Sequence, residues 1–456
     1  MTARPSPATA LGPSLLFLGG LCLAAGFAIL RDGIGFLPAR GLDRIEASAV
    51  APQPLRAPAP LDAAEIAAAQ EAWSYFRVNV RPGTGLADST AAYPSTTMWD
   101  QASHLLALVS ARLTGVIPEA EFQSRTRLLL SSLRQLPLFD GRLPNKAYNT
   151  ETLAMVDYAN TPVPEGIGWS AIDVSRLLLA LRILERHAPE MGDDIRAVVG
   201  RWDLAALASA GELTGAAREG EAVVYPQEGR LGYEQYAARA AAMWGVDVAA
   251  AISAAAAIGW RDVAGVDVPH DLRNHTVFRA ISPTLSEPYV LIGLEMGFDA
   301  ESALLAAQVY RAQEARFSQT GIPTMVSEDH LDREPWFVYS SVQSDGTDWA
   351  VLTDLGQAFP QYRTVSTKAA FAWHALYGTD YSALVRKAVL AGTGDGAGAG
   401  PQGVAATGKD GLWAGVYEAG GQPNAVLSLN TNAVVLEALA YQTAGPLWQA
   451  SARQAP

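Results

Sequence analysis

Helical patterns fill most of the chain after Asp62, and the loops between them differ widely in length. Apolar side chains recur at about 3.6-residue spacing in eleven stretches. We predict helices over residues 62–79, 97–115, 118–136, 170–188, 191–209, 233–257, 287–297, 300–318, 366–376, 380–391 and 430–443. Strand patterns are confined to two short segments, 221–226 and 336–342. The sequence therefore predicts an all-α fold class.

Two helical architectures accommodate this many helices. A solenoid would show a sequence period of roughly 34 to 47 residues, and the chain has none. The other architecture is a toroid of six helical hairpins, the (α/α)6 toroid, in which unequal loops gather at one end. Because the loops are long and rich in Trp, Tyr, Asn and acids, we predict this toroid. It would form one domain over residues 62–449, followed by a tail at 450–456.

The N-terminal part of the chain carries an uncharged apolar run at residues 14–30. This run is at the short end of the lengths that span a bilayer. No convincing small-residue cleavage site follows at the distance expected of a signal peptide. We predict a membrane anchor at 14–30, with residues 1–13 as a cytoplasmic tail, 31–61 as a Pro- and Ala-rich linker, and the domain in the periplasm. A cleaved signal peptide, which would leave a secreted or periplasmic domain, is the alternative.

Charge and motif content exclude several kinds of function. The formal net charge of −13 disfavours a nucleic-acid partner, because no basic stripe is present to neutralise phosphates. The single cysteine, Cys22, lies in the apolar run, and the six His are dispersed without an H-E-x-x-H motif. The chain also lacks a phosphate-binding loop and a G-x-S-x-G motif. We therefore predict no cofactor and no metal.

Six long loops place acids beside aromatic side chains. They are residues 81–100, 140–173, 225–236, 282–295, 324–349 and 415–432. Glycoside hydrolysis uses two carboxyl groups, one to protonate the leaving oxygen and one to act as nucleophile or to activate water. Aromatic rings can stack on the apolar faces of sugars, and amides can bind the hydroxyls. The loops therefore indicate carbohydrate chemistry.

Four acids are the candidate catalytic residues: Glu165, Glu287, Glu328 and Asp100. Asp100 and Glu287 also fit the first-turn acids that a helix dipole favours. Ser286 could cap the helix that carries Glu287. Asp173 fits the capping-box partner of Ser170, and we favour that structural role for it.

Rings, amides and further acids in the same loops are candidates for substrate binding. They are Trp99, Asn145, Tyr148, Trp169, Tyr233, Tyr289, Asp329, Trp336, Asp348, Trp349, Glu418, Asn430 and Asn432.

Several of these stretches resemble a known bacterial family. They include "YPSTTMWDQASHLLALVSARLTG", "LPNKAY", "EGIGWSAIDVSRLL" and "LNTNAVVLEALAY". They look like a domain-of-unknown-function family that is grouped with the six-hairpin glycosidases and is similar to glucoamylase-like domains and endo-β-1,2-glucanases. The resemblance covers nearly all of residues 63–449. It implies an (α/α)6 barrel, an envelope location and action on a glucan or exopolysaccharide, and it identifies no catalytic pair.

The leading functional hypothesis is an envelope glycoside hydrolase or transglycosylase that acts on a β-glucan or exopolysaccharide through paired carboxylates. Its partners would be that saccharide and the inner membrane, which residues 14–30 would enter. The alternative is a non-catalytic polysaccharide-binding protein that assists synthesis or export, with that machinery as its partner. A helical scaffold for other proteins is a third hypothesis, and it predicts that the loop acids do not converge.

Overall fold

A computed structural model describes residues 53–273, 278, 280–390, 407, 408 and 410–450 of the chain. The predicted tail, anchor and most of the linker, at 1–13, 14–30 and 31–52, lie outside the described residues, as does most of the C-terminal tail. Among the described residues, no helix combines the length and hydropathy that a membrane span needs.

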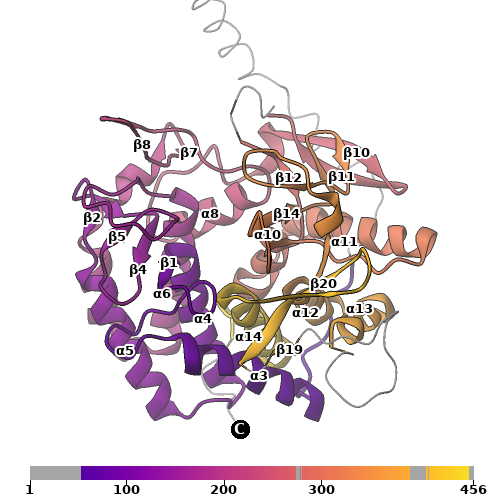
Figure 1. Cartoon of the computed structure of the whole chain (residues 1–456), viewed down its shortest axis with the longest axis horizontal. Helices are drawn as coiled ribbons and strands as arrows, with labels where there is room; N and C mark the ends of the chain where they lie inside the picture. Colours follow the sequence, from indigo (N-terminus) through magenta and orange to yellow (C-terminus); the bar gives the residue numbers. More distant parts are fainter. Residues whose placement is uncertain (1–52, 274–277, 279, 391–406, 409, 451–456) are drawn as a thin grey trace, which may run out of the picture. The chain divides into compact units, whose positions relative to one another are not determined.

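Six helices form a closed inner ring. They are α4 (Met98–Leu113), α6 (Ala171–His187), α8 (Tyr233–Ala242), α10 (Glu287–Leu291), α12 (Thr367–Tyr377) and α14 (Leu429–Ala444). Each packs against the next in this order, and α14 packs against α4 (Figure 1). A π-helical turn, η4 (Ile292–Met296), continues α10. Every residue of α12 and nearly every residue of α4 and α14 is buried, as expected of helices covered on all sides.

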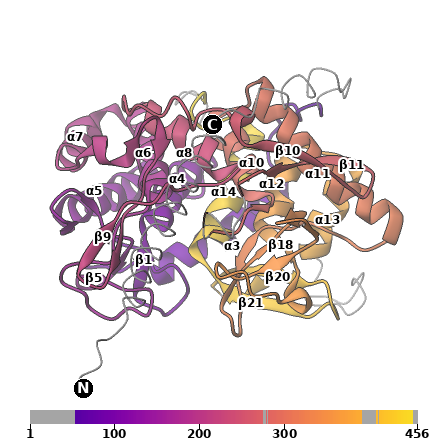
Figure 2. The same ribbon diagram turned by 90° about the horizontal axis from the view of Figure 1, so that it is seen from above.

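The remaining long helices lie outside this ring. They are α3 (Ala63–Asn79), α5 (Glu119–Gln135), α7 (Gly192–Val199), α11 (Ala300–Thr320) and α13 (Asp380–Leu390). Helix α3 packs against α14, α5 against α4, α7 against α6, α11 against α10 and α13 against α12 (Figure 2). Helix α5 buries only one face, with Phe122, Leu129 and Leu133 pointing inward. Outer and inner helices therefore alternate along most of the described chain.

Between α8 and α10 the described chain forms an antiparallel hairpin, β10 (Ile258–Val263) and β11 (Val266–Asp271), which packs on α11. The predicted helix over 233–257 is therefore wrong beyond Ala242. Gly245 has a φ of 81°, a left-handed conformation that commonly follows the end of a helix. The predicted helix over 191–209 is also wrong beyond Val199, where Gly200 follows and weakens helix propensity.

The structure corrects the all-α prediction, because short strands occur throughout the loops. Three-stranded sheets are β1 (Ser95–Thr97), β4 (Ala147–Asn149) and β5 (Met155–Val156); β12 (Pro283–Thr284), β15 (Gln343–Ser344) and β16 (Thr347–Asp348); and β13 (Glu328–His330), β14 (Phe337–Ser340) and β17 (Val351–Leu352). A four-stranded sheet contains β18 (Thr364–Ser366), β19 (Thr407–Gly408), β20 (Gly411–Tyr417) and β21 (Pro423–Leu427).

Smaller elements complete the loops. The two-stranded pairs are β2 (Leu138–Phe139) with β3 (Leu143–Pro144), β6 (Ala208–Ser209) with β7 (Glu212–Leu213), and β8 (Ala217–Glu219) with β9 (Ala222–Val224). The 3-10 turns are η1 (Pro189–Met191), η2 (Leu204–Leu207), η3 (Ala254–Ala256) and η5 (Pro360–Tyr362). The two predicted strand segments are confirmed as β9 and β14. The fold is therefore a mostly helical domain with small sheets in its loops.

Candidate active site

The N-terminal ends of the six inner helices meet at one end of the ring. Their first turns contribute Asp100 from α4, Asp173 from α6, Tyr233 from α8, Glu287 from α10, Lys368 from α12 and Asn430 from α14. A ring contact links the first turns of α4 and α8, and an ion pair and a hydrogen bond link the first turn of α10 to those of α12 and α14. Because helix dipoles present partial positive charge at their N-terminal ends, this end of the ring suits carboxylates.

Glu287 is at the centre of this convergence. It is 1% exposed, and its carboxylate forms an ion pair with the buried Nζ of Lys368. Oε1 accepts from Asn430 Nδ2 at 2.5 Å, and Oε2 accepts from Ser327 Oγ at 3.2 Å. Asn430 is itself oriented by Ser103 Oγ, which donates to its Oδ1 at 3.1 Å. The Glu287 carboxylate is thus fixed by three partners and has little contact with solvent.

Glu328, in β13, is partly exposed. Tyr233 donates its hydroxyl hydrogen to Glu328 Oε2 across 2.5 Å. Burial and the neighbouring Glu287 charge raise the pKa of Glu328 to about 7, against the opposing effects of Lys368, Tyr233 and Arg176. Glu328 can therefore gain or lose a proton near neutral pH.

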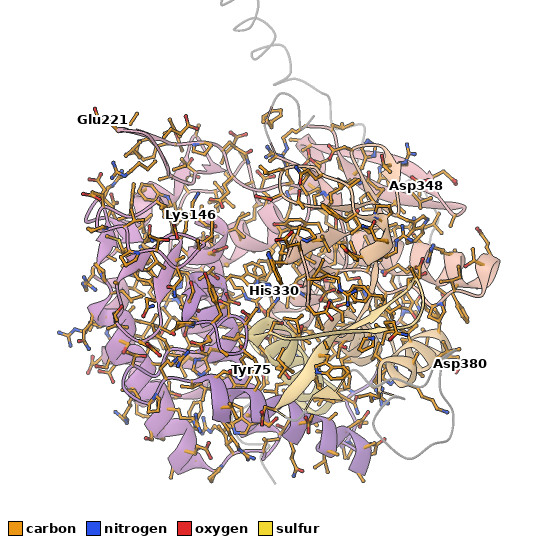
Figure 3. All side chains as sticks on the ribbon, viewed as in Figure 1. Tyr75, Lys146, Glu221, His330, Asp348 and Asp380 are labelled. Atoms are coloured by element: carbon orange, nitrogen blue, oxygen red, sulfur yellow. The ribbon has the colours of Figure 1, made fainter. Side chains whose placement is uncertain are left out.

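Asp329 follows Glu328 in β13 but points to a different environment. It is 2% exposed, and Oδ1 accepts from Ser366 Oγ at 3.2 Å. Its Oδ2 has no hydrogen-bond partner among the described residues. Burial raises the pKa of Asp329 to about 8, and Lys368 opposes that rise. His330, near the middle of Figure 3, is held neutral because burial lowers its pKa to about 4.

A second pair of carboxyl groups lies at the N-terminal end of α6. Glu228 accepts from Ser170 Oγ at 2.7 Å and from the backbone N–H of Ala171 at 2.6 Å, so it caps the helix. Asp173 is partly exposed. Burial and then the Glu228 charge raise the pKa of Asp173 to about 8, while Lys146 lowers it. Asp173 is thus poised to retain a proton at neutral pH.

Tyr339 lies within electrostatic reach of both Glu328 and Asp173. Tyr339 in β14 is the cross-strand partner of Glu328 in β13. Burial and the charges of Glu328, Asp354, Tyr158 and Asp173 hold the pKa of Tyr339 well above its usual value. Tyr339 is therefore close enough to feel both Glu328 and Asp173, and each of these three side chains is partly exposed.

A fully buried ionic network lies beside these residues. Arg176 in α6 pairs with Glu295 in η4 at 3.0 Å and with Glu437 in α14 at 3.5 Å. Its guanidinium lies 4.4 Å from the ring centroid of Trp99, and that ring meets Tyr233 at a centroid distance of 5.7 Å. Tyr236 donates to Glu295 across 2.5 Å. The network thus links α6, α8, η4 and α14 to the Trp99 side chain, which packs on Tyr233.

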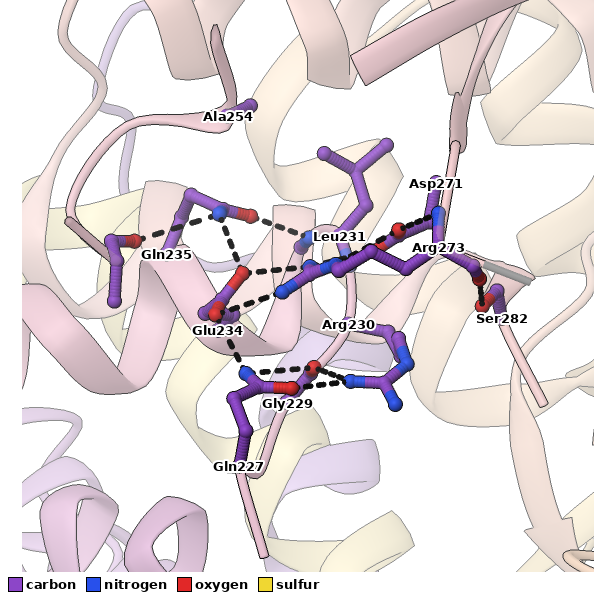
Figure 4. Close-up of polar contacts among 12 residues, drawn as sticks. Gln227, Gly229, Arg230, Leu231, Glu234, Gln235, Ala254, Asp271, Arg273 and Ser282 are labelled. Atoms are coloured by element: carbon purple, nitrogen blue, oxygen red, sulfur yellow. Dashed lines mark hydrogen bonds and ion pairs between the residues drawn. The ribbon is translucent and has the colours of Figure 1, made fainter. Parts of the chain in front are cut away.

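The loop before α8 is anchored by a separate network, drawn in Figure 4. Arg273 pairs with Glu234 at 2.7 Å and with Asp271 at 2.6 Å, and Asp271 Oδ2 accepts from the backbone N–H of Leu231 at 2.9 Å. Gly232 has a φ of 95°, and a Cβ there would lie 2.8 Å from Pro288 Cγ. The close approach of α10 to this glycine helps to place Tyr233 beside Glu328.

The structure brings two of the four predicted catalytic acids together, Glu287 and Glu328. Asp100 is 6% exposed and forms a complete capping box with Thr97, and Ser89 Oγ also donates to it at 2.5 Å. Its charge is felt by Asp173. Glu165 is exposed, and no contact among the described residues joins its carboxylate to the other three acids.

Two further structural predictions concern the residues at the starts of α6 and α10. Asp173 N–H donates to Ser170 Oγ at 3.1 Å, but the reciprocal bond of the predicted capping box, from the Ser170 N–H to the Asp173 carboxylate, does not form. Glu228 instead accepts from the next backbone N–H, that of Ala171. Ser286 stands at the predicted N-cap position of α10, but its side chain makes no capping hydrogen bond. Ser286 Oγ instead accepts from Trp373 Nε1 at 2.8 Å.

Among the predicted substrate-binding residues, Trp99, Tyr233, Asp329 and Asn430 belong to the convergent site. Five others are fully or almost fully buried: Asn145, Tyr148, Trp169, Tyr289 and Asn432. Of these, Tyr148 OH donates to the carbonyl of Pro137 at 2.6 Å, and Asn432 Oδ1 accepts from Leu412 N–H at 2.8 Å. These contacts hold loops together.

The remaining predicted binding residues lie in the loops at 324–349 and 415–432. Asp348 pairs with Arg261 at 2.7 Å, and Glu418 pairs with Arg316 and Arg363 at 2.6 and 2.8 Å. Trp349 stacks under Arg316 at 5.0 Å. Trp336 is 59% exposed and has a φ of 72°, an unusual conformation for a bulky residue. No described contact joins these four to Glu287 or Glu328.

Several members of the site were not singled out from the sequence: Glu228, Lys368, Arg176, Glu295 and Glu437. Three of them, Arg176, Glu295 and Glu437, interrupt apolar helical patterns with a charge, a signal that could have identified them. Among the described residues, no group of three or more His, Cys, Asp or Glu side chains is arranged to hold a metal ion.

Solved structures of carbohydrate-active proteins share this fold. A provisionally named glucoamylase from Bacteroides caccae ATCC 43185 has a TM-score of 0.59 at 13% identity, over 84% of this chain and 94% of that chain. An endo-β-1,2-glucanase from Chitinophaga pinensis, solved with sophorotriose and glucose, has a TM-score of 0.56 at 12% identity, over 85% and 94%. The Talaromyces funiculosus endo-β-1,2-glucanase with sophorose has a TM-score of 0.53 at 11% identity, over 82% and 83%.

At such low identities these matches show the fold alone, a mostly helical domain of the glycosidase-like kind. No protein of characterised function matches the chain closely enough to be informative. The family resemblance read from the sequence is confirmed. The pattern of a family of proteins of unknown function, DUF3131, matches residues 67–445, which is most of the chain, and the protein therefore belongs to the DUF3131 family.

Proposed function

We propose that the domain is an (α/α)6 toroid that acts as a glycoside hydrolase or transglycosylase on a β-glucan or related exopolysaccharide. The observation that carries this proposal is Glu328, a partly exposed carboxyl at the convergence of six helix N-termini with a pKa of about 7. Perturbed acids in such positions are typical of catalytic sites. Structural relatives named as β-1,2-glucanases support a β-glucan as the first substrate to test.

In this proposal Asp173 is the proton donor. Its neighbour Glu228 disfavours a second negative charge, so Asp173 retains its proton up to a pKa of about 8. The Asp173 O–H would protonate the glycosidic oxygen while the bond from that oxygen to the anomeric carbon breaks.

Glu328 is the carboxylate that activates the acceptor. Lys368, Arg176 and the Tyr233 hydroxyl all favour its ionised form. It would remove a proton from a water molecule as the water oxygen bonds to the anomeric carbon. In transglycosylation, a sugar hydroxyl would take the place of that water. At the end of the step Asp173 is ionised and Glu328 is protonated, and exchange with solvent restores both.

Tyrosines supply the surface on which a sugar would lie. Tyr158 is 66% exposed, yet it feels the charges of Asp173, Glu228 and Asp354. Tyr339 is partly exposed beside Glu328. Rings near both carboxyl groups could stack on the apolar face of a pyranose while their hydroxyls bind those of the sugar.

The test is to incubate the full chain with linear β-1,2-, β-1,3- and β-1,4-glucans and with bacterial exopolysaccharides, and to measure reducing ends and chain length. We expect at least one polymer to be shortened or redistributed in length. Glu328→Gln and Asp173→Asn should each lower kcat by roughly 100-fold or more. Glu221→Gln, on an exposed hairpin at the edge of Figure 3, is the matched control and should behave as the unmodified protein.

Two outcomes would contradict this proposal. If the unmodified protein leaves every polymer intact but binds one, the non-catalytic polysaccharide-binding alternative is favoured. If a polymer is cleaved equally well by Glu328→Gln, the assignment of Glu328 is wrong.

We also propose that the domain acts outside the cytoplasm, tethered to the inner membrane by residues 14–30. The length and hydropathy of that run support this location. Protease added to intact spheroplasts should digest the domain, and residues 14–30 should remain in the membrane fraction. A domain that is protected until the membrane is lysed would contradict the proposal.

A further inference from the structure

The buried ion cluster around Arg176 is unusual for a helical core. Arg176, Glu295 and Glu437 are all 0% exposed. Burial raises the pKa of both glutamates, and the Glu295 charge raises that of Glu437 further. Two atoms of the guanidinium, Nε and Nη1, have no hydrogen-bond partner among the described residues. Burying such a cluster is costly, and apolar replacements of similar volume are often at least as stable. Stability alone therefore does not account for it.

The orientation of Arg176 indicates what the cluster does. Both glutamates contact the guanidinium at Nη2, and its central carbon, Cζ, lies over the Trp99 ring at 4.4 Å from the centroid and over the Tyr236 ring at 5.8 Å. Arg is suited to such stacking because its charge is spread over a plane. One side of the Trp99 ring thus packs against a buried cation that two ion pairs hold in place.

The other contact of Trp99 leads to the candidate base. The Trp99 ring meets the Tyr233 ring edge to face at 5.7 Å and an interplanar angle of 66°. Tyr233 in turn donates to Glu328 Oε2 at 2.5 Å. A shift of the Trp99 ring would therefore move the hydroxyl that orients the Glu328 carboxylate.

We propose that Arg176 is a positioning residue for Glu328, acting through Trp99 and Tyr233 and through its own charge. This inference rests on the proposed function, since it assigns a role in the same site. The groups that act on Glu328 are Glu287 from α10, Lys368 from α12, Tyr233 from α8, Arg176 from α6 and Tyr339 from the adjoining strand β14, with Asp329 next to it in β13. Arg176 is one of two cations among them, and both favour the ionised carboxylate.

Two variants separate the effect of Arg176 through its packing on Trp99 from the effect of its charge. Arg176→Lys keeps the charge and loses the flat face, so kcat should fall roughly 10- to 100-fold while the acid limb of the pH profile stays in place. The triple variant Arg176→Met, Glu295→Gln, Glu437→Gln removes the cation without leaving two glutamates uncompensated. In that variant the acid limb should move to higher pH.

The matched control is Arg182→Met on the same helix. Arg182 also stacks on a tryptophan, Trp244 at 3.8 Å, and pairs with Glu185 at 2.8 Å, but it is partly exposed and has no contact with Trp99. It should leave both kcat and the pH profile unchanged. If it lowers kcat as much as Arg176→Lys does, the effect is general to α6 and the inference is wrong.

A second readout needs no substrate. In full-length protein labelled with carboxyl 13C glutamate, the resonance lost in Glu328→Gln identifies Glu328, and its titration gives the pKa directly. We expect this midpoint to rise in the folded triple variant. An unchanged midpoint would overturn the inference even if the enzyme is active. An inactive unmodified protein would overturn the proposed function, and the midpoint would still report on Arg176.

Discussion

The hydroxyl oxygen of Tyr233 lies 2.5 Å from Oε2 of Glu328, and this hydrogen bond crosses from the first turn of an inner helix to a loop strand. A donor at that distance stabilises the ionised carboxylate, opposing the burial and the Glu287 charge that raise its pKa. The pH dependence of the proposed reaction should therefore report on this contact.

Tyr233→Phe should raise the pKa of Glu328 above about 7, because the phenyl ring keeps the packing against Trp99 and removes the donor. Glu328 must be ionised to act as a base, so the acid limb of kcat/KM against pH should move to higher pH. An acid limb that stays in place or moves to lower pH would show that this hydrogen bond does not set the ionisation of Glu328.

Lys368→Met should destabilise the fold. Lys368 is 3% exposed and pairs with the equally buried Glu287, so its loss leaves a buried carboxylate without its cation. Breaking such a pair from one side costs about 3–5 kcal/mol. Urea denaturation measures this cost. Lys387→Met, at an exposed position on α13, is the control and should stay within about 0.5 kcal/mol of the unmodified protein. Equal stabilities for the two variants would contradict the prediction.

Asp100→Asn separates the structural and catalytic interpretations of this residue. Its capping box with Thr97 and its bond from Ser89 predict a loss of about 1 kcal/mol of stability. We expect a lower Tm by calorimetry and a kcat within a few-fold of the original at a temperature where both proteins are folded. A large loss of kcat with an unchanged Tm would restore Asp100 as a catalytic candidate.

The helices were predictable because their apolar spacing is a local property of the chain. Helices α4, α5 and α6 lie within one or two residues of the predicted bounds. The hairpin of β10 and β11 was missed, although Ala264 and Gly265, both at positive φ, stand between alternating apolar and polar residues. The alanine-rich stretch before it matched a helix more strongly than this short signal matched a hairpin.

The candidate site was only partly predictable. Glu287 and Glu328 stand out because each lies in an acid- and aromatic-rich loop. Asp173 looked like an ordinary first-turn acid, and its pairing with Glu228 joins two loops 55 residues apart in sequence numbering. Convergence of this kind depends on ring closure, which local patterns do not encode.

His104→Leu should make the fold less sensitive to acid. His104 is 0% exposed, and burial lowers its pKa to about 3. The unfolded chain takes up a proton at about pH 6.5, so the folded state is penalised progressively as pH falls from about 6.5 to about 3. The full penalty is about 5 kcal/mol. The difference in free energy of unfolding between the two proteins should change by about this amount between pH 7 and pH 3, and a constant difference would contradict a neutral buried His104.

Glu228→Gln should lower the pKa of Asp173. The Glu228 charge is the largest cause, after burial, of the raised value of about 8, and the glutamine keeps the shape and one acceptor for the cap of α6. Asp173 must be protonated to act as the acid, so a lower pKa moves the basic limb of kcat/KM to lower pH. The unmodified protein should be most active between about pH 7 and 8, where Glu328 is ionised and Asp173 is still protonated. In Glu228→Gln the upper pH limit of this range should fall while the lower limit stays in place. Glu221→Gln should leave both limits unchanged. If the basic limb stays near pH 8 in Glu228→Gln, then Asp173 is not the group that donates the proton.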